Sequence, residues 1–163
     1  MIISGFAYWQ TNQLPNKAYQ YIQQINFDLY EHRGVFVAKP GEMEPTLEDK
    51  IANMDAYFSK GEHLVALGGY HELLKGDPDN LELQLRIGLL ELKEGNYEET
   101  KEYLTKAYQQ NDAAFSLDAA WGLALWNIQY HSNLDRARTL MEEIVAKRGN
   151  YFKEAENLLE VMK

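Results

Sequence analysis

Histidines are the residues of this sequence best suited to metal binding or acid–base chemistry. The chain has four, His32, His63, His71 and His131. His63 and His71 are about two helical turns apart, so they would share a helix face only loosely. No HExxH pattern occurs, and no acidic residue completes a convincing set of metal ligands. We therefore interpret the histidines as surface or turn residues and expect no metal site.

Motifs for nucleophilic catalysis and for phosphate or calcium binding are incomplete. Ser4 precedes a glycine, but no GxSxG elbow is present, and the chain has no cysteine to act as a nucleophile. Gly68-Gly69 lacks the Lys-Ser/Thr of a phosphate loop, and the Asp-Pro-Asp-Asn segment 77–80 lacks the EF-hand spacing. We expect no catalytic residue and no cofactor, and we predict that the protein is not an enzyme.

The glycine pair Gly68-Gly69 falls inside a predicted helix. Two interior glycines cost a helix about 2 kcal/mol relative to alanine, so a compensating contact is expected there. We predict close packing against another element, such as the N-terminal segment; a kink or a partner contact is the alternative.

Charge, cysteine content and hydropathy indicate the compartment and exclude two classes of partner. The formal net charge is −9, whereas nucleic-acid binding usually shows a basic patch that attracts phosphates. No stretch approaches the ~18 apolar residues that a membrane span requires, and the start of the chain lacks the pattern of a signal peptide. The absence of cysteine fits a reducing compartment. We expect a soluble, cytoplasmic protein that binds neither nucleic acid nor membranes.

Residues 1–46 are predicted to form a small strand–helix–strand appendage followed by a linker. Residues 2–9 and 35–38 are rich in β-branched, aromatic and other apolar side chains, as strands are. Between them, residues 15–32 have a helical pattern of apolar residues: Ala18, Tyr21, Ile22, Ile25 and Leu29. Two prolines and a glycine then mark a break in the chain. We therefore expect a separate helical domain over residues 47–163.

After this break the apolar pattern is helical throughout and repeats at a regular spacing. Thr46 is a predicted helix N-cap. Turns are predicted at residues 61–63, 95–97 and 132–134, each between two apolar helical segments. The first two turns are 34 residues apart, and the third follows after 37. A period of this size is typical of stacked helical hairpins, in which each hairpin buries its apolar face against the next.

The residues around these turns resemble the tetratricopeptide repeat (TPR) family, whose unit is a hairpin of two helices in 34 residues. With Leu47 as the first position, the family's characteristic residues are matched in the first unit by Tyr57, Gly61, Ala66 and Pro78. In the later units they are matched by Gly88, Gly95-Asn96-Tyr97, Ala107, Trp121 and Ala137. The resemblance implies a mainly α fold: a TPR-like superhelix of antiparallel helical hairpins, with about three repeats and a capping helix near residues 151–163.

In TPR arrays the first helix of each hairpin lines a concave groove that receives peptides or partner helices. Carried over to this chain, these positions give an apolar and aromatic partner-binding surface: Ile51, Asp55, Phe58, Leu85, Leu89, Leu92, Lys93, Gly122, Trp126, Gln129 and Tyr130. Chaperone-binding TPRs clamp a C-terminal carboxylate with a lysine and asparagines. The pairs Ile51/Asp55 and Leu85/Leu89 replace that clamp here, so we expect no such tail recognition. The alternative is that Leu85, Leu89 and Trp126 are core residues, or are covered by the N-terminal segment.

The resemblance predicts a non-catalytic protein–protein interaction module or adaptor that binds a peptide or helix in its apolar groove. Its binding energy would be concentrated in the aromatic residues Phe58, Trp126 and Tyr130. The alternative function is self-assembly, in which the N-terminal segment or the groove joins copies of the chain into a homo-oligomer. No feature of the sequence names the partner.

Overall fold

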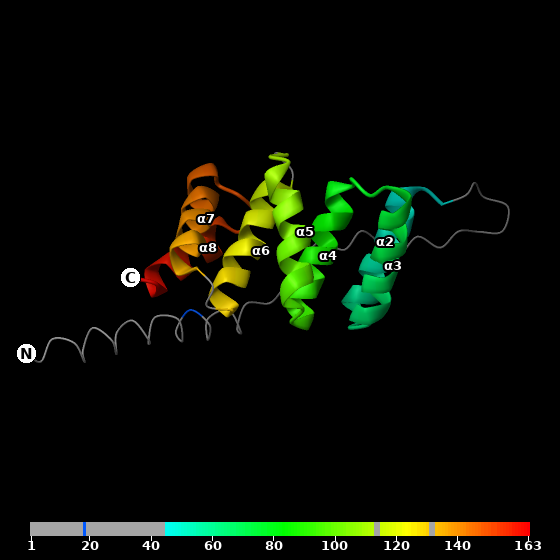
Figure 1. Ribbon diagram of the computed structural model, residues 1–163, viewed down its shortest axis with the longest axis horizontal. Coiled ribbons are helices and arrows are strands. Elements are labelled where there is room, and N and C mark those ends of the chain that lie inside the picture. Colours follow the sequence, from blue (N-terminus) through cyan, green and yellow to red (C-terminus); the bar gives the residue numbers. More distant parts are fainter. Residues whose placement is uncertain (1–17, 19–44, 113–114, 131–132) are drawn as a thin grey trace, which may run out of the picture.

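The computed structural model describes residues 45–112, 115–130 and 133–163, together with Ala18. All regular structure in these residues is helical. Successive helices stand side by side in a row and run alternately up and down (Figure 1). They are α2 (Leu47–Ser59), α3 (His63–Gly76), α4 (Leu81–Glu94), α5 (Tyr97–Gln109), α6 (Ser116–Gln129), α7 (Leu134–Lys147) and α8 (Phe152–Val161). The fold is therefore mainly α, as the sequence predicts.

The predicted N-terminal appendage lies outside the described residues. This applies to the strands at 2–9 and 35–38 and to the helix at 15–32, except for Ala18, which is helical and buried. Because the described residues contain no strand, the expected β-α-β arrangement gains no support from the structure.

Helix starts follow from side-chain caps that the local sequence supplies. Thr46 accepts a hydrogen bond from the backbone N–H of Asp49, and the Asp49 carboxylate accepts one from the Thr46 N–H over 2.9 Å, which completes a capping box. Asn80 and Asn133 cap α4 and α7, each accepting from the backbone N–H three residues ahead. The start of α2 after Thr46 is thus confirmed.

Tight turns separate the helices of each pair. Gly61 and Gly95 have φ angles of +80° and +85°, a left-handed conformation that glycine adopts without strain. Gly95 directly follows α4, and Gly61 lies just beyond the end of α2, where turns are predicted. Since the connections are short, α2 packs against α3, α4 against α5, and α6 against α7. We call α2, α4 and α6 the A helices, and α3, α5 and α7 the B helices.

Buried apolar side chains form two clusters that share α4. The smaller cluster joins the first hairpin (α2 and α3) to α4 and consists of Ile51, Ala66, Leu67, Tyr70, Leu83, Ile87 and Leu90. The larger cluster extends over the central block (α4 to α8) and includes Leu85, Leu89, Leu92, Leu104, Trp121, Met141 and Leu158. Helix α4 contributes one apolar stripe to each cluster, and it therefore connects the two parts of the molecule.

Gly88 and Gly69 allow neighbouring helices to pack closely. A Cβ on Gly88 would come within 2.7 Å of the Leu104 side chain and 3.1 Å of its backbone nitrogen, so α4 and α5 approach closely there. A Cβ on Gly69 would lie 1.9 Å from the Met54 sulfur atom of α2. The close packing expected at the glycine pair is thus confirmed for Gly69, although its partner is α2 rather than the N-terminal segment. At Gly68 a Cβ would meet no described atom within 4 Å, so the described helices do not pack closely there, and a contact with the N-terminal segment lies outside the described residues.

Burial differs between the A and B helices. Helix α4 is buried at every position from Leu83 to Leu92, and α6 at every position from Asp118 to Ile128. Helix α5 buries a single stripe of Thr100, Leu104 and Ala107, and α3 and α7 are similar. Because a helix completes a turn every 3.6 residues, α4 and α6 are covered on all sides, whereas each B helix keeps one face in solvent.

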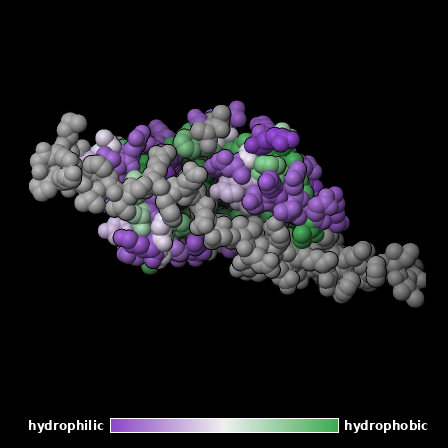
Figure 2. Space-filling model, turned by 180° about the vertical axis from the view of Figure 1, so that it is seen from behind, coloured by the Kyte–Doolittle hydropathy of each residue, from purple (hydrophilic) through white to green (hydrophobic). Residues whose placement is uncertain are grey.

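The described surface is mostly hydrophilic. Figure 2 shows hydrophilic side chains over most of the described part of the face seen from behind, with smaller apolar areas between them. Large apolar side chains are exposed at Leu47, Leu64 and Val65, at the starts of α2 and α3. No described helix is both long and apolar enough to cross a membrane.

Candidate functional site

The residues predicted to line the groove fall into three classes of exposure. Most of them are buried: Ile51, Asp55, Leu85, Leu89, Leu92, Gly122 and Trp126. Phe58, Gln129 and Tyr130 are half-buried, and Lys93 is exposed. All of them lie on the A helices or directly after α6, so the structure brings them to neighbouring helices. The buried majority agrees with the alternative that these residues are core or covered, rather than with an open apolar trough.

A buried ionic network joins the first hairpin to α4. The Asp55 carboxylate of α2 accepts hydrogen bonds from the Tyr70 hydroxyl of α3 and from the Arg86 guanidinium of α4. Arg86 also donates to Glu82 over 2.7 Å, and the side chains of Asp55 and Arg86 are 7% and 2% exposed. Burial, and then the hydrogen bond to Asp55, raises the pKa of Tyr70 well above its usual range, so Tyr70 stays a neutral donor. Asp55 therefore holds three helices in register.

Aromatic side chains gather at the ends of the A helices, which all run in the same direction. The Tyr97 ring packs against Trp126 and Tyr130, with ring centroids 4.7 and 4.8 Å away. The Trp126 indole N–H donates to the Tyr97 carbonyl over 3.0 Å. Farther along the row, the Lys93 ammonium group lies 4.9 Å from the Phe58 ring centroid. We call Phe58, Lys93, Tyr97, Trp126 and Tyr130 the aromatic edge; it contains all three predicted hot spots.

Arg86 and Tyr97 are members of these clusters that the sequence patterns do not mark as site residues. Arg86 carried a usable signal, since a cation that interrupts an apolar run of a buried helix requires a buried anion as partner. Asp55 is that partner, and the side chains of both residues are buried. Tyr97 is assigned only to a turn, although it begins α5 and its ring reaches Trp126 and Tyr130 at the end of α6 in the next hairpin.

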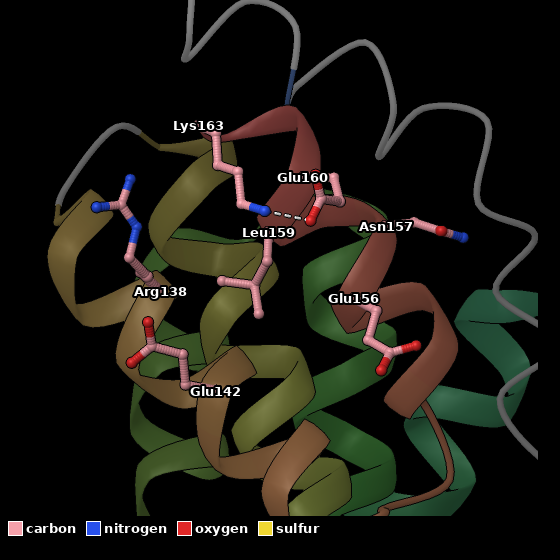
Figure 3. Close-up of a pocket in the computed structure, with 7 residues that line it drawn as sticks. All are labelled: Arg138, Glu142, Glu156, Asn157, Leu159, Glu160 and Lys163. Atoms are coloured by element: carbon pink, nitrogen blue, oxygen red, sulfur yellow. Dashed lines mark hydrogen bonds and ion pairs between the residues drawn. The ribbon is translucent and has the colours of Figure 1, made fainter.

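A surface cavity of about 750 Å³ lies between α7 and α8. Figure 3 shows its lining, with Arg138 and Glu142 on α7 and with Glu156 and Glu160 on α8. The Lys163 ammonium group pairs with Glu160 at its edge. These long charged side chains keep their ends in water, and the lining lacks the apolar walls of a typical ligand pocket. We interpret this cavity as solvated space between two helices.

A second, smaller cavity of about 300 Å³ lies between α5 and α7, above α6. The Lys101 ammonium group lies 5.5 Å from the Trp126 ring centroid, and Arg136 lines the other side. Trp126 is 4% exposed, so little of its ring is open to this cavity. Of the aromatic edge, Trp126 is thus the buried member, whereas Phe58, Tyr97 and Tyr130 are half-buried and Lys93 is exposed.

A buried acid near the start of α6 is the remaining chemical feature. Asp118 accepts a hydrogen bond from the Asn150 amide over 3.1 Å, and burial raises the pKa of its carboxyl group. Burial, with Asp118 and Glu154 nearby, raises the pKa of Tyr151 to about 12, and its ring stacks on Trp121 with centroids 5.2 Å apart. This contact ties α6 to the segment before α8. No group of three metal-binding side chains occurs in the described part of the chain.

Comparisons with known proteins assign no family to this chain. No protein-family model matches the chain, and neither the curated proteins nor the solved structures gave a match. The TPR resemblance therefore stays a prediction, based on the positions of its residues and turns.

Proposed function

We propose that this chain is a non-catalytic interaction module of TPR-like architecture, an adaptor that binds a peptide or an amphipathic helix across its A helices. Its helices alternate with short turns at Gly61 and Gly95, and α4 contacts both α5 and α6. Arrays of this kind present the first helix of each hairpin on one continuous face, which suits an extended partner. A cytoplasmic location is part of the proposal, based on the absence of cysteine.

The aromatic edge is the observation that carries this proposal. Phe58 and Tyr130 are half-buried, so each is a large, firmly held ring at the surface of the array. Lys93 places a positive charge beside Phe58 in a chain whose net charge is −9. Rigid aromatic anchors next to a basic group are typical of binding hot spots, and a partner helix with apolar and acidic residues fits them.

The test is the affinity of the full-length chain for amphipathic helical peptides of about 20 residues, selected from a display library and titrated by calorimetry. Phe58→Ala and Tyr130→Ala are each expected to weaken binding at least tenfold, roughly 1.4 kcal/mol, because each removes a central anchor. Trp126→Ala is less informative, because its buried ring and indole hydrogen bond also support folding.

Phe152→Ala is the matched control for Phe58→Ala. Phe152 is also a half-buried phenylalanine beside a cation, with the Arg148 guanidinium 5.7 Å from its ring centroid, but it lies in α8. Binding by this variant should stay within about twofold of the unmodified chain. A selected peptide that binds Phe58→Ala, Tyr130→Ala and the unmodified chain equally well would remove the aromatic edge from the site, and with it the proposal.

Self-association is a second candidate, and exposed apolar residues on α3 favour it. Leu64 and Val65 are 73% and 50% exposed. Gly68 lies one turn further along, where a Cβ would meet no described atom within 4 Å, so another helix could approach closely. Sedimentation of the full-length chain at tens of micromolar decides between the candidates. A dimer that dissociates after Leu64→Lys supports self-association, and a monomer eliminates it.

A further inference from the structure

Ala18 is the one described residue ahead of Pro45, and it belongs to the larger apolar cluster. It is helical and 0% exposed. It shares the cluster with Leu85 and Leu89 of α4 and with residues of α6. The N-terminal part of the chain therefore contacts the central block at this point.

The burial of α4 and α6 requires a cover that the B helices do not supply. Helix α4 packs against α3, α5 and α6, and α6 packs against α4, α5 and α7. These neighbours lie on the B side or along the row. Nevertheless every position of α4 from Leu83 to Leu92 is buried, so no side of the helix is left in solvent over these turns. Another part of the chain must therefore lie over the opposite side of the A helices.

The sequence around Ala18 has the chemistry of such a cover. Residues 15–32 carry apolar side chains at helical spacing, and Ala18 is a member of that stripe. The burial of Ala18 places this one member of the stripe against the central block. We propose that α4 and α6 form a helix-binding face, and that its resident occupant is the amphipathic segment 15–32 of the same chain.

The dimensions permit this contact within one chain. A helix over residues 15–32 would be about 27 Å long, enough to cross α4 and α6 at a spacing of about 10 Å per helix. Residues 33–45 connect it to the Thr46 cap of α2 and can span about 45 Å when extended. Helices α2 and α6 are about 20 Å apart at ordinary packing distances, so the connection is long enough.

The occupant also regulates the face. Residues 15–32 are tethered at an effective concentration on the order of millimolar, so an external helix must compete with them. This consequence rests on the proposed function, whereas the contact within the chain does not. The kind of external partner follows as well: an amphipathic helix with a small residue in its apolar stripe, as at Ala18.

Thiol labelling tests the contact in the full-length chain. The sequence has no cysteine, so Ala18→Cys and Ala146→Cys each introduce a single thiol. Ala146 is the matched control, because it is a helical alanine of α7 that is exposed. The thiol of Ala18→Cys should react with a disulfide reagent at least about tenfold more slowly under native conditions. Equal rates would overturn the proposal.

A labelled peptide of residues 12–33 tests the occupant itself, by fluorescence anisotropy with Ala18→Glu, Ala146→Glu and unmodified chains. Ala18→Glu places a charge in the apolar contact and should release the face. It should therefore bind the peptide at least about tenfold more tightly than the other two chains, whose own segment competes. A folded Ala18→Glu chain that binds no peptide overturns the proposal. Should Ala18→Glu lose its helical circular dichroism signal, the labelling rates decide alone.

Two further outcomes separate this proposal from its alternatives. Protection of Ala18→Cys that appears only in dimers, as seen by light scattering at several concentrations, would make the occupant a second copy and overturn the contact within one chain. In the second outcome, the selected peptides lose affinity with Phe58→Ala, and the 12–33 peptide binds none of the chains. This result would overturn the proposal that segment 15–32 occupies the face, but it would keep the proposed function. If instead the 12–33 peptide binds Ala18→Glu and the selected peptides do not depend on Phe58, segment 15–32 stays the occupant and the proposed binding of an external partner is overturned.

Discussion

The first hairpin and the central block are held by different kinds of contact. The central block has one large apolar cluster from α4 to α8. The first hairpin has a smaller apolar cluster and the buried network in which Asp55 meets Tyr70 and Arg86. It also exposes Leu64 and Val65, whereas the central block exposes no large apolar side chain among its described residues.

The two kinds of contact have different effects: apolar burial stabilises the fold, and the ionic network fixes how the first hairpin docks. Apolar burial stabilises without strong directional demands, so the central block should supply most of the free energy of unfolding. A buried ion pair adds little net stability because both charges lose their hydration, but it penalises every packing that separates them. The first hairpin should therefore be the part of the described structure that opens first, and the ionic network should set how it docks on α4.

Removing the largest fully buried side chain of the central block should have the largest effect. Trp121 is 0% exposed and stacks on Tyr151, so Trp121→Ala leaves a cavity and should cost about 3–5 kcal/mol of unfolding free energy. Urea denaturation followed by circular dichroism measures this loss. A loss below about 1 kcal/mol would show that the central block does not provide the stability assigned to it.

Breaking the ionic network should have a smaller and more local effect. Arg86→Met leaves the Asp55 carboxylate buried without its cation and should cost about 3 kcal/mol. Amide hydrogen exchange should rise in α2 and α3 and stay unchanged in α7 and α8. The double variant Asp55→Leu/Arg86→Met is the control and should recover most of the loss. Equal exchange changes in both parts of the molecule would contradict the proposed separation.

Neutralising Asp118 should stabilise the central block modestly and in a pH-dependent way. Burial raises the pKa of the folded Asp118 carboxyl group above its ordinary value of 3.8. The folded state therefore incurs no penalty for this group below pH 3.8, where it is neutral, and loses stability as the pH rises through the folded pKa and the buried group ionises. Asp118→Asn still accepts from Asn150 and should raise the melting temperature at pH 7, with the gain vanishing near pH 3. A gain that is independent of pH would show that desolvation of the carboxylate is not its cause.

Polar substitution on the exposed face of the first hairpin should have the smallest effect. Leu64→Lys and Val65→Lys remove no buried contact, so each should change the unfolding free energy by less than about 0.5 kcal/mol. Thermal melts at low protein concentration measure this. A larger loss would mean that these residues are covered in solution, either by another part of the chain or by a second copy.

The helices and turns could be predicted because their determinants are local. The Thr46 cap and the turns at Gly61 and Gly95 depend on side chains and φ angles within a few residues. Only part of the contact at Gly69 could be predicted. A glycine inside a helix indicates that another element packs closely there, but the identity of that neighbour, Met54, depends on how α2 docks.

The candidate site was less predictable because burial depends on distant residues. Periodicity marks Leu85 and Leu89 as one apolar stripe, but it does not say what lies against that stripe. Arg86 and Asp55 come from different hairpins, so no local pattern pairs them. The aromatic edge was partly predictable, since Phe58 and Tyr130 follow from the resemblance, while Tyr97 joins them only through the fold.

The most direct test of the binding face is a hydrogen-exchange footprint of the Ala18→Glu chain, in which the face is released, with and without a saturating amphipathic peptide from the selection above. We predict that exchange slows in the A helices, over Leu47–Ser59, Leu81–Glu94 and Ser116–Gln129. The B helices α3, α5 and α7 should keep their exchange rates, because their free faces lie on the other side of the row. Slowing over the B helices and none over the A helices would contradict the account.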